Sequence, residues 1–261
     1  MISEVFASGE SLLHRLDPRL KIVVASAFAV LIAVSHRFPT LIAAVSIGLV
    51  LLWQARLDAR ALVRRLLPVN ALIVFFWLVL PWTVPGEPWS RLGPLVFTHE
   101  GLRLAAEITL KANAILMVLV ALVATHPIAT LGYALSRLGV PAKLVQLLLF
   151  TYRYIIVIEQ EYTRLYRAAR MRGFQPRTSL HTYKTFAYLL GMLFVRAANR
   201  AQRVYHAMQC RGFCGRFYSL HDFAFTTTDT IWAMLFTGLL LGLAWLEWSV
   251  AELNPCITAL R

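Results

Sequence analysis

The sequence predicts an all-α, polytopic membrane protein with about five transmembrane helices and two long cytoplasmic helices. The first reason is composition: 59% of the 261 residues are hydrophobic and 15% are charged, whereas soluble domains carry about 25% charged residues. The second is a series of long uncharged runs, each bounded by charged or helix-breaking residues. The third is a basic region at residues 126–228, where helical periodicity continues but charge returns.

Membrane spans are predicted at about residues 20–35, 40–54, 68–82, 101–125 and 230–248. Asp17 precedes Pro18 in the order expected for an N-cap and the first turn of a helix. The first two spans are shorter than the roughly 20 residues that a bilayer requires, but flanking Lys and Arg side chains can extend toward the interface. The N-terminal membrane region is therefore assigned to residues 1–125.

Two segments of this region lie outside the spans. Residues 57–67 are expected to form a short basic amphipathic connector, with Pro68 opening the third span. Residues 83–100 are rich in proline and glycine and are predicted to be loop. Inside the fourth span, Glu107 and Lys111 stand four residues apart in the order that favours an ion pair. A charged pair in a span is a functional candidate, but mutual pairing near the outer end of the span is the favoured interpretation.

The segment 126–228 is the predicted cytoplasmic region. A short helix at 131–138 precedes two long helices at about 141–172 and 184–211, each apolar in its first half and basic in its second. The remaining residues, 229–261, hold the last transmembrane helix and the tail.

The distribution of basic residues orients the chain with its N-terminus in the cytoplasm. Segments 1–21, 55–67 and 126–228 hold 3, 4 and 14 of the 26 Lys and Arg residues. Cytoplasmic segments carry such an excess, so the C-terminus is placed outside. Membrane topology thus accounts for the net charge of +13, and no nucleic-acid partner is inferred. The predicted location is the inner (cytoplasmic) membrane of a bacterial cell.

Sequence motifs for catalysis are absent. The chain has no G-x-x-x-x-G-K-[ST] phosphate loop, no H-E-x-x-H, no G-x-S-x-G and no C-x-x-C. Its three cysteines suggest no disulfide framework. His206, Cys210 and Cys214 are spaced four apart, but Gly212 is expected to end their helix, so no metal site is predicted. No catalytic residue and no cofactor are predicted in this chain.

One eleven-residue pattern occurs twice. Residues 164–174 and 203–213 both follow R-x-Y-[RH]-A-x-x-x-R-G-F. The candidate site residues are Ala168, Arg172, Gly173 and Phe174 in the first copy and Ala207, Arg211, Gly212 and Phe213 in the second. A Gly after an Arg commonly caps a helix C-terminus. Capping does not require the phenylalanine or the tyrosine, so the repetition indicates a further function.

A protein interface accounts for the repeated pattern. Arg172 and Arg211 are expected at two cytoplasmic helix tips, each beside an aromatic anchor, Phe174 or Phe213. An aromatic in a groove next to an Arg paired with a partner carboxylate is a typical interface hot spot. Two near-identical tips suggest two near-identical sockets, such as a dimer of partner subunits offers.

In these features the chain resembles the transmembrane T component of energy-coupling factor (ECF) transporters, the EcfT/CbiQ family. The resemblance rests on L-D-P-R-L-K at residues 16–21 and on the two Arg-Gly motifs before the last span, and it covers nearly the whole chain. Residues 6–21 and 207–213 look most similar to CbiQ of cobalt uptake systems. Family motifs are often Ala-Arg-Gly, whereas Met171 and Cys210 precede the arginines here, which leaves the role of the arginines intact.

The resemblance implies a non-catalytic coupling subunit of an ECF-type ABC importer. The long helices would act as coupling helices, and their tips would insert into grooves on two ABC-type ATPase subunits (CbiO-like). Arg172 and Arg211 would pair with acidic groups there, and ATP and Mg²⁺ would be bound by the ATPases. The other implied partners are a substrate-capturing membrane subunit (CbiM-like), a small accessory membrane subunit and membrane lipid. The implied solute is cobalt, in the context of cobalamin biosynthesis, with nickel or vitamin uptake as alternatives.

Two functions of other classes are alternatives. An integral-membrane enzyme acting on lipid phosphates would use the basic region to bind phosphate, but the acidic clusters that hold metal ions in such sites are missing. A peripheral scaffold would bind anionic lipid through its basic helices collectively, with no special place for Arg172 and Arg211.

Overall fold

The computed structural model describes residues 16–55, 59–84, 88–92, 95–213 and 227–253. These residues divide into two compact units. The membrane unit comprises the described residues of 4–131 and 223–261, and the arm unit comprises those of 132–222. The arm unit is thus inserted into the sequence of the membrane unit.

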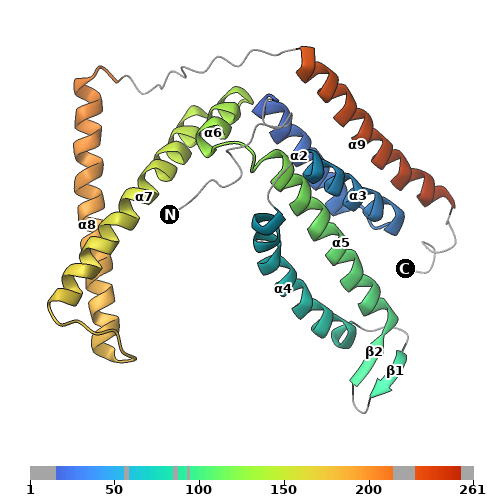
Figure 1. The fold of residues 1–261 in the computed structure, drawn as a ribbon, viewed down its shortest axis with the longest axis horizontal. Helices are drawn as coiled ribbons and strands as arrows, with labels where there is room; N and C mark the ends of the chain where they lie inside the picture. Colours follow the sequence, from blue (N-terminus) through green and yellow to red (C-terminus); the bar gives the residue numbers. More distant parts are fainter. Residues whose placement is uncertain (1–15, 56–58, 85–87, 93–94, 214–226, 254–261) are drawn as a thin grey trace. The chain divides into compact units, whose positions relative to one another are not determined.

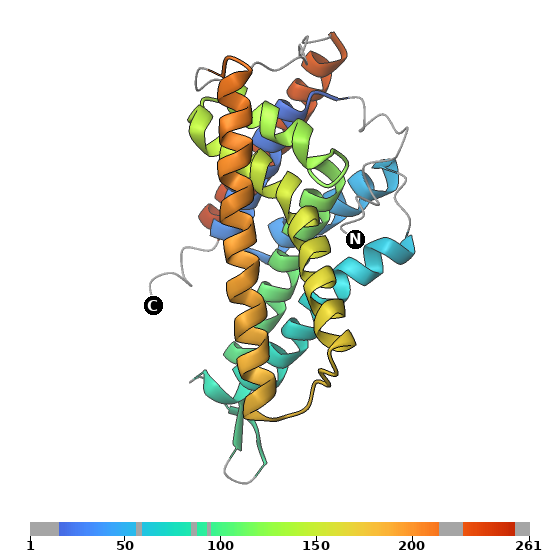
Figure 2. The ribbon, with the colours of Figure 1, turned by 90° about the vertical axis from the view of Figure 1, so that its left-hand side faces the viewer.

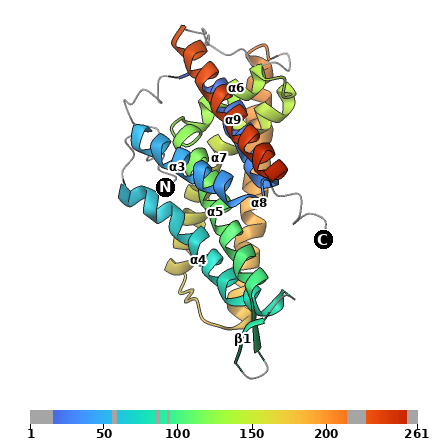
Figure 3. The same cartoon turned by 90° about the vertical axis from the view of Figure 1, so that its right-hand side faces the viewer.

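Five helices form the membrane unit: α2 (Pro18–Val34), α3 (Phe38–Ala55), α4 (Ala59–Thr83), α5 (His99–Leu122) and α9 (Thr227–Leu253). Helix α5 packs against α2, α3 and α4, while α9 packs against α2 and α3 (Figures 1 and 3). Phe28, Leu41, Val118 and Phe236 are fully buried where these helices meet. A Cβ atom at Gly48 would lie 3.0 Å from Met117 Cβ, so α3 and α5 approach each other closely at that point.

Each predicted span corresponds to one of these helices, as expected for an all-α polytopic membrane protein. Four of them, α3, α4, α5 and α9, are long and apolar enough to cross a membrane. Helix α2 has 17 residues and is shorter than the roughly 20 that a straight crossing needs. Asp17 caps α2 as predicted, since its carboxylate accepts a hydrogen bond from the Arg19 N–H at 2.8 Å.

The prediction of a separate connector before the third span was wrong. Helix α4 runs without a break from Ala59 through Pro68. The arginines and leucines before the proline are good helix formers, and membrane helices tolerate an internal proline.

The prediction of loop for residues 83–100 was also wrong in part. Strands β1 (Pro88–Leu92) and β2 (Leu95–Thr98) form an antiparallel hairpin, and α5 begins directly after it. Pro88 is the first residue of its strand, a position where the missing N–H is tolerated. A high proline content therefore did not exclude strands here.

The predicted ion pair in the fourth span does form. Lys111 Nζ lies 2.8 Å from Glu107 Oε1, and the same oxygen lies 2.7 Å from His36 Nδ1. Glu247 on α9 accepts hydrogen bonds from Ser35 Oγ (2.6 Å) and from the His36 N–H (3.1 Å). These contacts join α5 and α9 to the turn after α2. The pair of Glu107 and Lys111 therefore has a structural role, as the favoured interpretation expected.

The arm unit consists of two long helices and most of a short one. Helix α6 (Ile128–Arg137) leads into it, followed by α7 (Ala142–Met171) and α8 (Leu180–Cys210). A Cβ atom at Gly132 would lie 2.6 Å from Leu149 Cδ2, so α6 packs tightly on α7. Residues 172–179 join α7 to α8, and the two helices run in opposite directions and cross (Figures 1 and 2).

Helix α8 begins earlier than the sequence prediction of residue 184. Ser179 caps it, because its hydroxyl accepts a hydrogen bond from the Thr182 N–H at 3.4 Å. The Thr182 hydroxyl in turn accepts one from the Arg177 N–H at 3.2 Å. Along its length α8 exposes large apolar side chains, among them Leu180, Tyr188 and Phe194.

Candidate functional site

The first Arg-Gly ending closes α7 with a left-handed glycine. Gly173 has φ +85°, which costs glycine little and other residues much. Its N–H donates to the Arg170 carbonyl at 3.0 Å, and the Phe174 N–H donates to the Ala169 carbonyl at 3.2 Å. This pair of hydrogen bonds defines a Schellman cap.

The second ending repeats that geometry at the end of α8. Gly212 has φ +76°, its N–H donates to the Gln209 carbonyl at 3.0 Å, and the Phe213 N–H donates to the Met208 carbonyl at 3.1 Å. The prediction that each glycine ends its helix is confirmed. The two motifs therefore present their arginines from the same backbone conformation.

Both arginines of the motif lie at the surface of the arm unit. Arg172 and Arg211 are exposed, and neither makes an ion pair or side-chain hydrogen bond with the part of the chain that the structure describes. Ala168 and Ala207 lie four residues before them, on the same helix face, and are exposed too. An alanine there leaves the guanidinium uncovered and open to a partner.

The two phenylalanines have different surroundings. Phe174 is 9% exposed and meets the Phe186 ring edge-on at 5.7 Å between centroids. Phe186 also stacks on Tyr166 at 6.4 Å. Phe213 is half-buried and lines a groove between α7 and α8. Phe174 thus packs inside the arm unit and fixes its ending against α8.

The two endings lie far apart. The 31 residues of α8 extend over about 46 Å at 1.5 Å per residue. The Phe174 contact places the first ending beside the beginning of α8, whereas Arg211 follows its last turn. The arm unit therefore holds its two arginines about 40 Å apart, because most of α8 separates them.

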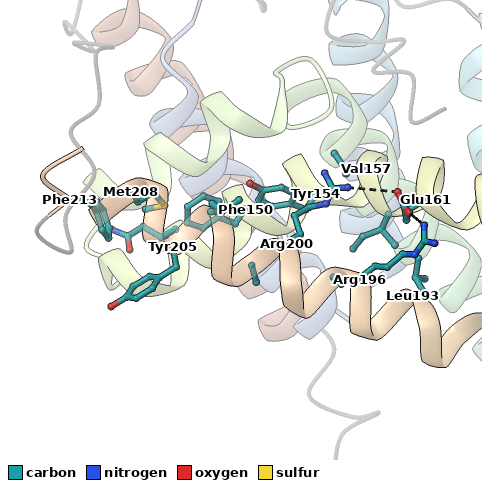
Figure 4. Close-up of a pocket in the computed structure, with 15 residues that line it drawn as sticks. Phe150, Tyr154, Val157, Glu161, Leu193, Arg196, Arg200, Tyr205, Met208 and Phe213 are labelled. Atoms are coloured by element: carbon teal, nitrogen blue, oxygen red, sulfur yellow. Dashed lines mark hydrogen bonds and ion pairs between the residues drawn. The ribbon is translucent and has the colours of Figure 1, made fainter. Parts of the chain in front are cut away.

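An apolar groove of about 420 Å³ lies where α7 and α8 diverge. In Figure 4, Phe150, Tyr154 and Val157 of α7 face Leu193 and Met208 of α8. The groove extends from Glu161 toward the second ending (Figure 4). Its size and apolar walls are typical of a site that takes an apolar group.

Three arginines surround Glu161 at one end of the groove. Arg196 of α8 donates a hydrogen bond to Glu161 Oε1, while Arg164 and Arg200 approach Oε2 at 3.6 and 3.7 Å. The hydrogen bond from Arg196 is the main reason that the pKa of Glu161 lies below its usual range. The sequence analysis missed this cluster. The available signal was an acid in a strongly basic region, but its partners on α8 are not visible in the sequence.

Two of the three residues spaced four apart near the second ending are described by the structure. His206 and Cys210 are exposed on α8, and Gly212 ends the helix as predicted, while Cys214 falls outside the described residues. Within those residues, no group of three or more His, Cys, Asp and Glu side chains is arranged to hold a metal ion.

Comparison with known proteins gives matches over most of the chain. A sequence model of the CbiQ family, described as "Cobalt transport protein", matches residues 9–220. An "Energy-coupling factor transporter transmembrane protein EcfT" from Acidaminococcus fermentans is 27% identical over 260 residues, covering 93% of this chain and 95% of its own.

Proteins with the same name from Thermosediminibacter oceani and Heliobacterium modesticaldum are also similar. The first is 29% identical over 229 residues, which is 80% of this chain and 83% of that protein. The second is 30% identical over 223 residues, or 79% and 81%. The similarity thus includes residues of both the membrane unit and the arm unit.

Proposed function

Because this chain belongs to the CbiQ family, the transmembrane T components of energy-coupling factor transporters, we propose that it couples ATP hydrolysis by partner subunits to solute uptake. One observation carries the proposal. Two Schellman caps of the same geometry present exposed arginines at opposite ends of the arm unit. Helix capping explains the glycines and a basic residue near each C-terminus, but it does not require the same eleven-residue pattern at both ends.

Two ABC-type ATPase subunits are the proposed partners of these arginines. A guanidinium binds a carboxylate through two parallel hydrogen bonds, so Arg172 and Arg211 each fit an acidic socket. A dimer of ATPases offers two equivalent sockets. The length of α8 then sets the spacing of about 40 Å that the two sockets must match.

The groove between α7 and α8 is the proposed contact with the substrate-capturing membrane subunit. Its apolar walls and the exposed aromatic residues of α8 suit an apolar partner surface. Closure of the ATPase pair would move the two tips, tilt α7 and α8, and transmit that tilt through the groove. This chain would remain non-catalytic, with ATP and Mg²⁺ bound by the ATPases.

Cobalt is the proposed solute, in an inner membrane with the N-terminus of this chain in the cytoplasm. The description of the matching family supports cobalt, and the three basic segments support the orientation. Uptake of Co²⁺ by cells that express the complete transporter, with Ni²⁺ and vitamins tested in parallel, decides between the solutes.

The coupling role is tested by reversing both charges. Arg172→Glu with Arg211→Glu is expected to abolish co-purification of the ATPase subunits and solute uptake, because each acidic socket then meets a like charge. Arg153→Glu with Lys184→Glu is the matched control, since it changes the same charge on exposed positions of the same helices outside the repeated pattern. Normal assembly and uptake by the first double variant would contradict the proposal.

A further inference from the structure

The L-D-P-R-L-K motif at residues 16–21 has no part in the site described above, yet it contains the most deeply buried charged group of the membrane unit. Lys21 is fully buried. Its Nζ atom lies 2.7 Å from His126 Nε2 and 3.3 Å from Thr125 Oγ1. His126 Nε2 also lies 3.3 Å from the Leu16 carbonyl oxygen. The lysine therefore ties the first turn of α2 to the segment after α5.

The same motif is tied to α9. The Asp17 N–H donates to Asp229 Oδ1 at 3.1 Å, and Asp229 is in the first turn of α9. Both aspartates are buried, and Asp229 is the acid whose charge acts on Lys21. Residues 17–21 thus hold two other parts of the membrane unit through buried polar contacts.

Both parts are the places where the chain passes between the two units. Thr125 and His126 lie directly before α6, through which the chain leaves the membrane unit for the arm unit. Asp229 lies just after the chain returns to the membrane unit. One short motif in the first helix therefore holds both connections of the arm unit.

We propose that Asp17 and Lys21 form a root clasp, positioning residues that fix the two chain connections of the arm unit to each other. The root clasp is defined by Asp17, Lys21, Thr125, His126 and Asp229. This inference rests on the proposed coupling role. A tilt of α7 and α8 can reach the membrane unit only if the connections of the arm do not move independently. Held by α2, they form one rigid base.

A simple ion pair between Lys21 and Asp229 would not explain why the contacts of this motif reach two separate segments. A buried lysine needs only one countercharge, which either connection of the arm unit could supply. Replacing such an ion pair by neutral groups is often tolerated. Here the lysine contacts one connection and the backbone of Asp17 contacts the other. The polar groups are divided between the two connections, as a clasp requires.

The test measures the arm directly. In a chain whose three cysteines are replaced by serine, spin labels are placed at Met171→Cys on the arm and at Trp53→Cys on the membrane unit, two highly exposed positions. Pulsed electron paramagnetic resonance then gives the distribution of distances between the labels in the complete transporter complex. Lys21→Met with Asp229→Leu removes the cation, its countercharge and the acceptor of the Asp17 N–H together. The chain with an intact root clasp is expected to give a single distance peak, and the double variant is expected to lose it.

Lys111→Met is the matched control, because it removes a lysine of the same unit that pairs with Glu107 far along α5. It is expected to keep the single peak. An unchanged distribution in the double variant would overturn the inference, as would failure of that variant to fold, since the motif would then serve folding only. Failure of the coupling role is seen separately, as retention of the ATPases by the Arg172→Glu, Arg211→Glu chain.

Discussion

The two Arg-Gly endings have the same backbone but different neighbours. Each closes its helix with a left-handed glycine and the same two hydrogen bonds. Phe174, however, is packed against Phe186, whereas Phe213 lines the groove between α7 and α8. Local sequence therefore determines the cap, and tertiary contacts determine what surrounds it. The first ending is fixed against the start of α8, and the second follows the end of that helix.

Single charge reversals give the largest expected effect and test whether the two endings have equivalent partners. Truncating one partner of a buried charge pair typically costs about 2–5 kcal/mol, and a reversed charge adds repulsion to that loss. Arg172→Glu and Arg211→Glu are therefore each expected to weaken ATPase association by about 30-fold or more. Titration of the purified chain with the ATPase subunits measures this. A strong loss in only one variant would show that the sockets differ.

Truncation of the two phenylalanines is expected to lower the free energy of unfolding by different amounts at the two endings. Phe174→Ala should lower the free energy of unfolding by about 3 kcal/mol, because a buried ring is removed from the contact with Phe186. Phe213→Ala should cost less, since its ring is only half-buried. Thermal unfolding in detergent compares the two variants, with Phe174→Leu as a volume-conserving control. Equal losses of stability in Phe174→Ala and Phe213→Ala would contradict the different burial of the two rings.

Alanine at the two glycines is expected to cost the same at both endings. Gly173 and Gly212 both have positive φ, and no atom lies within 4 Å of a Cβ added at either. The penalty is therefore the backbone term alone, about 1 kcal/mol per site. Asparagine tolerates this conformation better, so Gly→Asn at each site should cost less than Gly→Ala. Unequal penalties, measured by thermal unfolding, would show that the caps are not equivalent.

Low pH is expected to loosen the contact between α7 and α8, and this is the smallest of the expected effects. The pKa of Glu161 is lowered, mainly by the hydrogen bond from Arg196, so this pairing stabilises the arm at pH values above the usual glutamate pKa. The stability is lost as the pH falls through the lowered value. Spin labels at Met171→Cys and His206→Cys should report a broader distance distribution in that range. Glu161→Gln should give the broader distribution already at neutral pH, without further pH dependence.

Sequence reasoning identified the elements whose signals are local. The two long helices end at the predicted glycines, Asp17 caps the first helix, and Glu107 pairs with Lys111, because each depends on residues within one or two turns. The hairpin at 88–98 was not found, since proline content alone does not distinguish a strand that begins with proline from loop.

Contacts between distant residues were beyond the sequence. Glu161 and Arg196 are 35 residues apart in the chain, and Lys21 and His126 are 105 apart. No periodicity within one helix indicates which residue of another helix will face it. The burial of Phe174 could not be predicted for the same reason, since its partner Phe186 belongs to the next helix. Two copies of one motif therefore looked equivalent until their neighbours were known.

The exposed apolar face of α8 has a consequence for the life of the subunit in the cell. Leu180, Tyr188 and Phe194 are open on this helix, and surfaces of this kind promote aggregation and attract chaperones when they stay uncovered. Chain made in excess over its partners is therefore expected to be degraded as an orphan. If the capture subunit covers α8 as proposed, the amount of this protein would then follow the supply of that subunit.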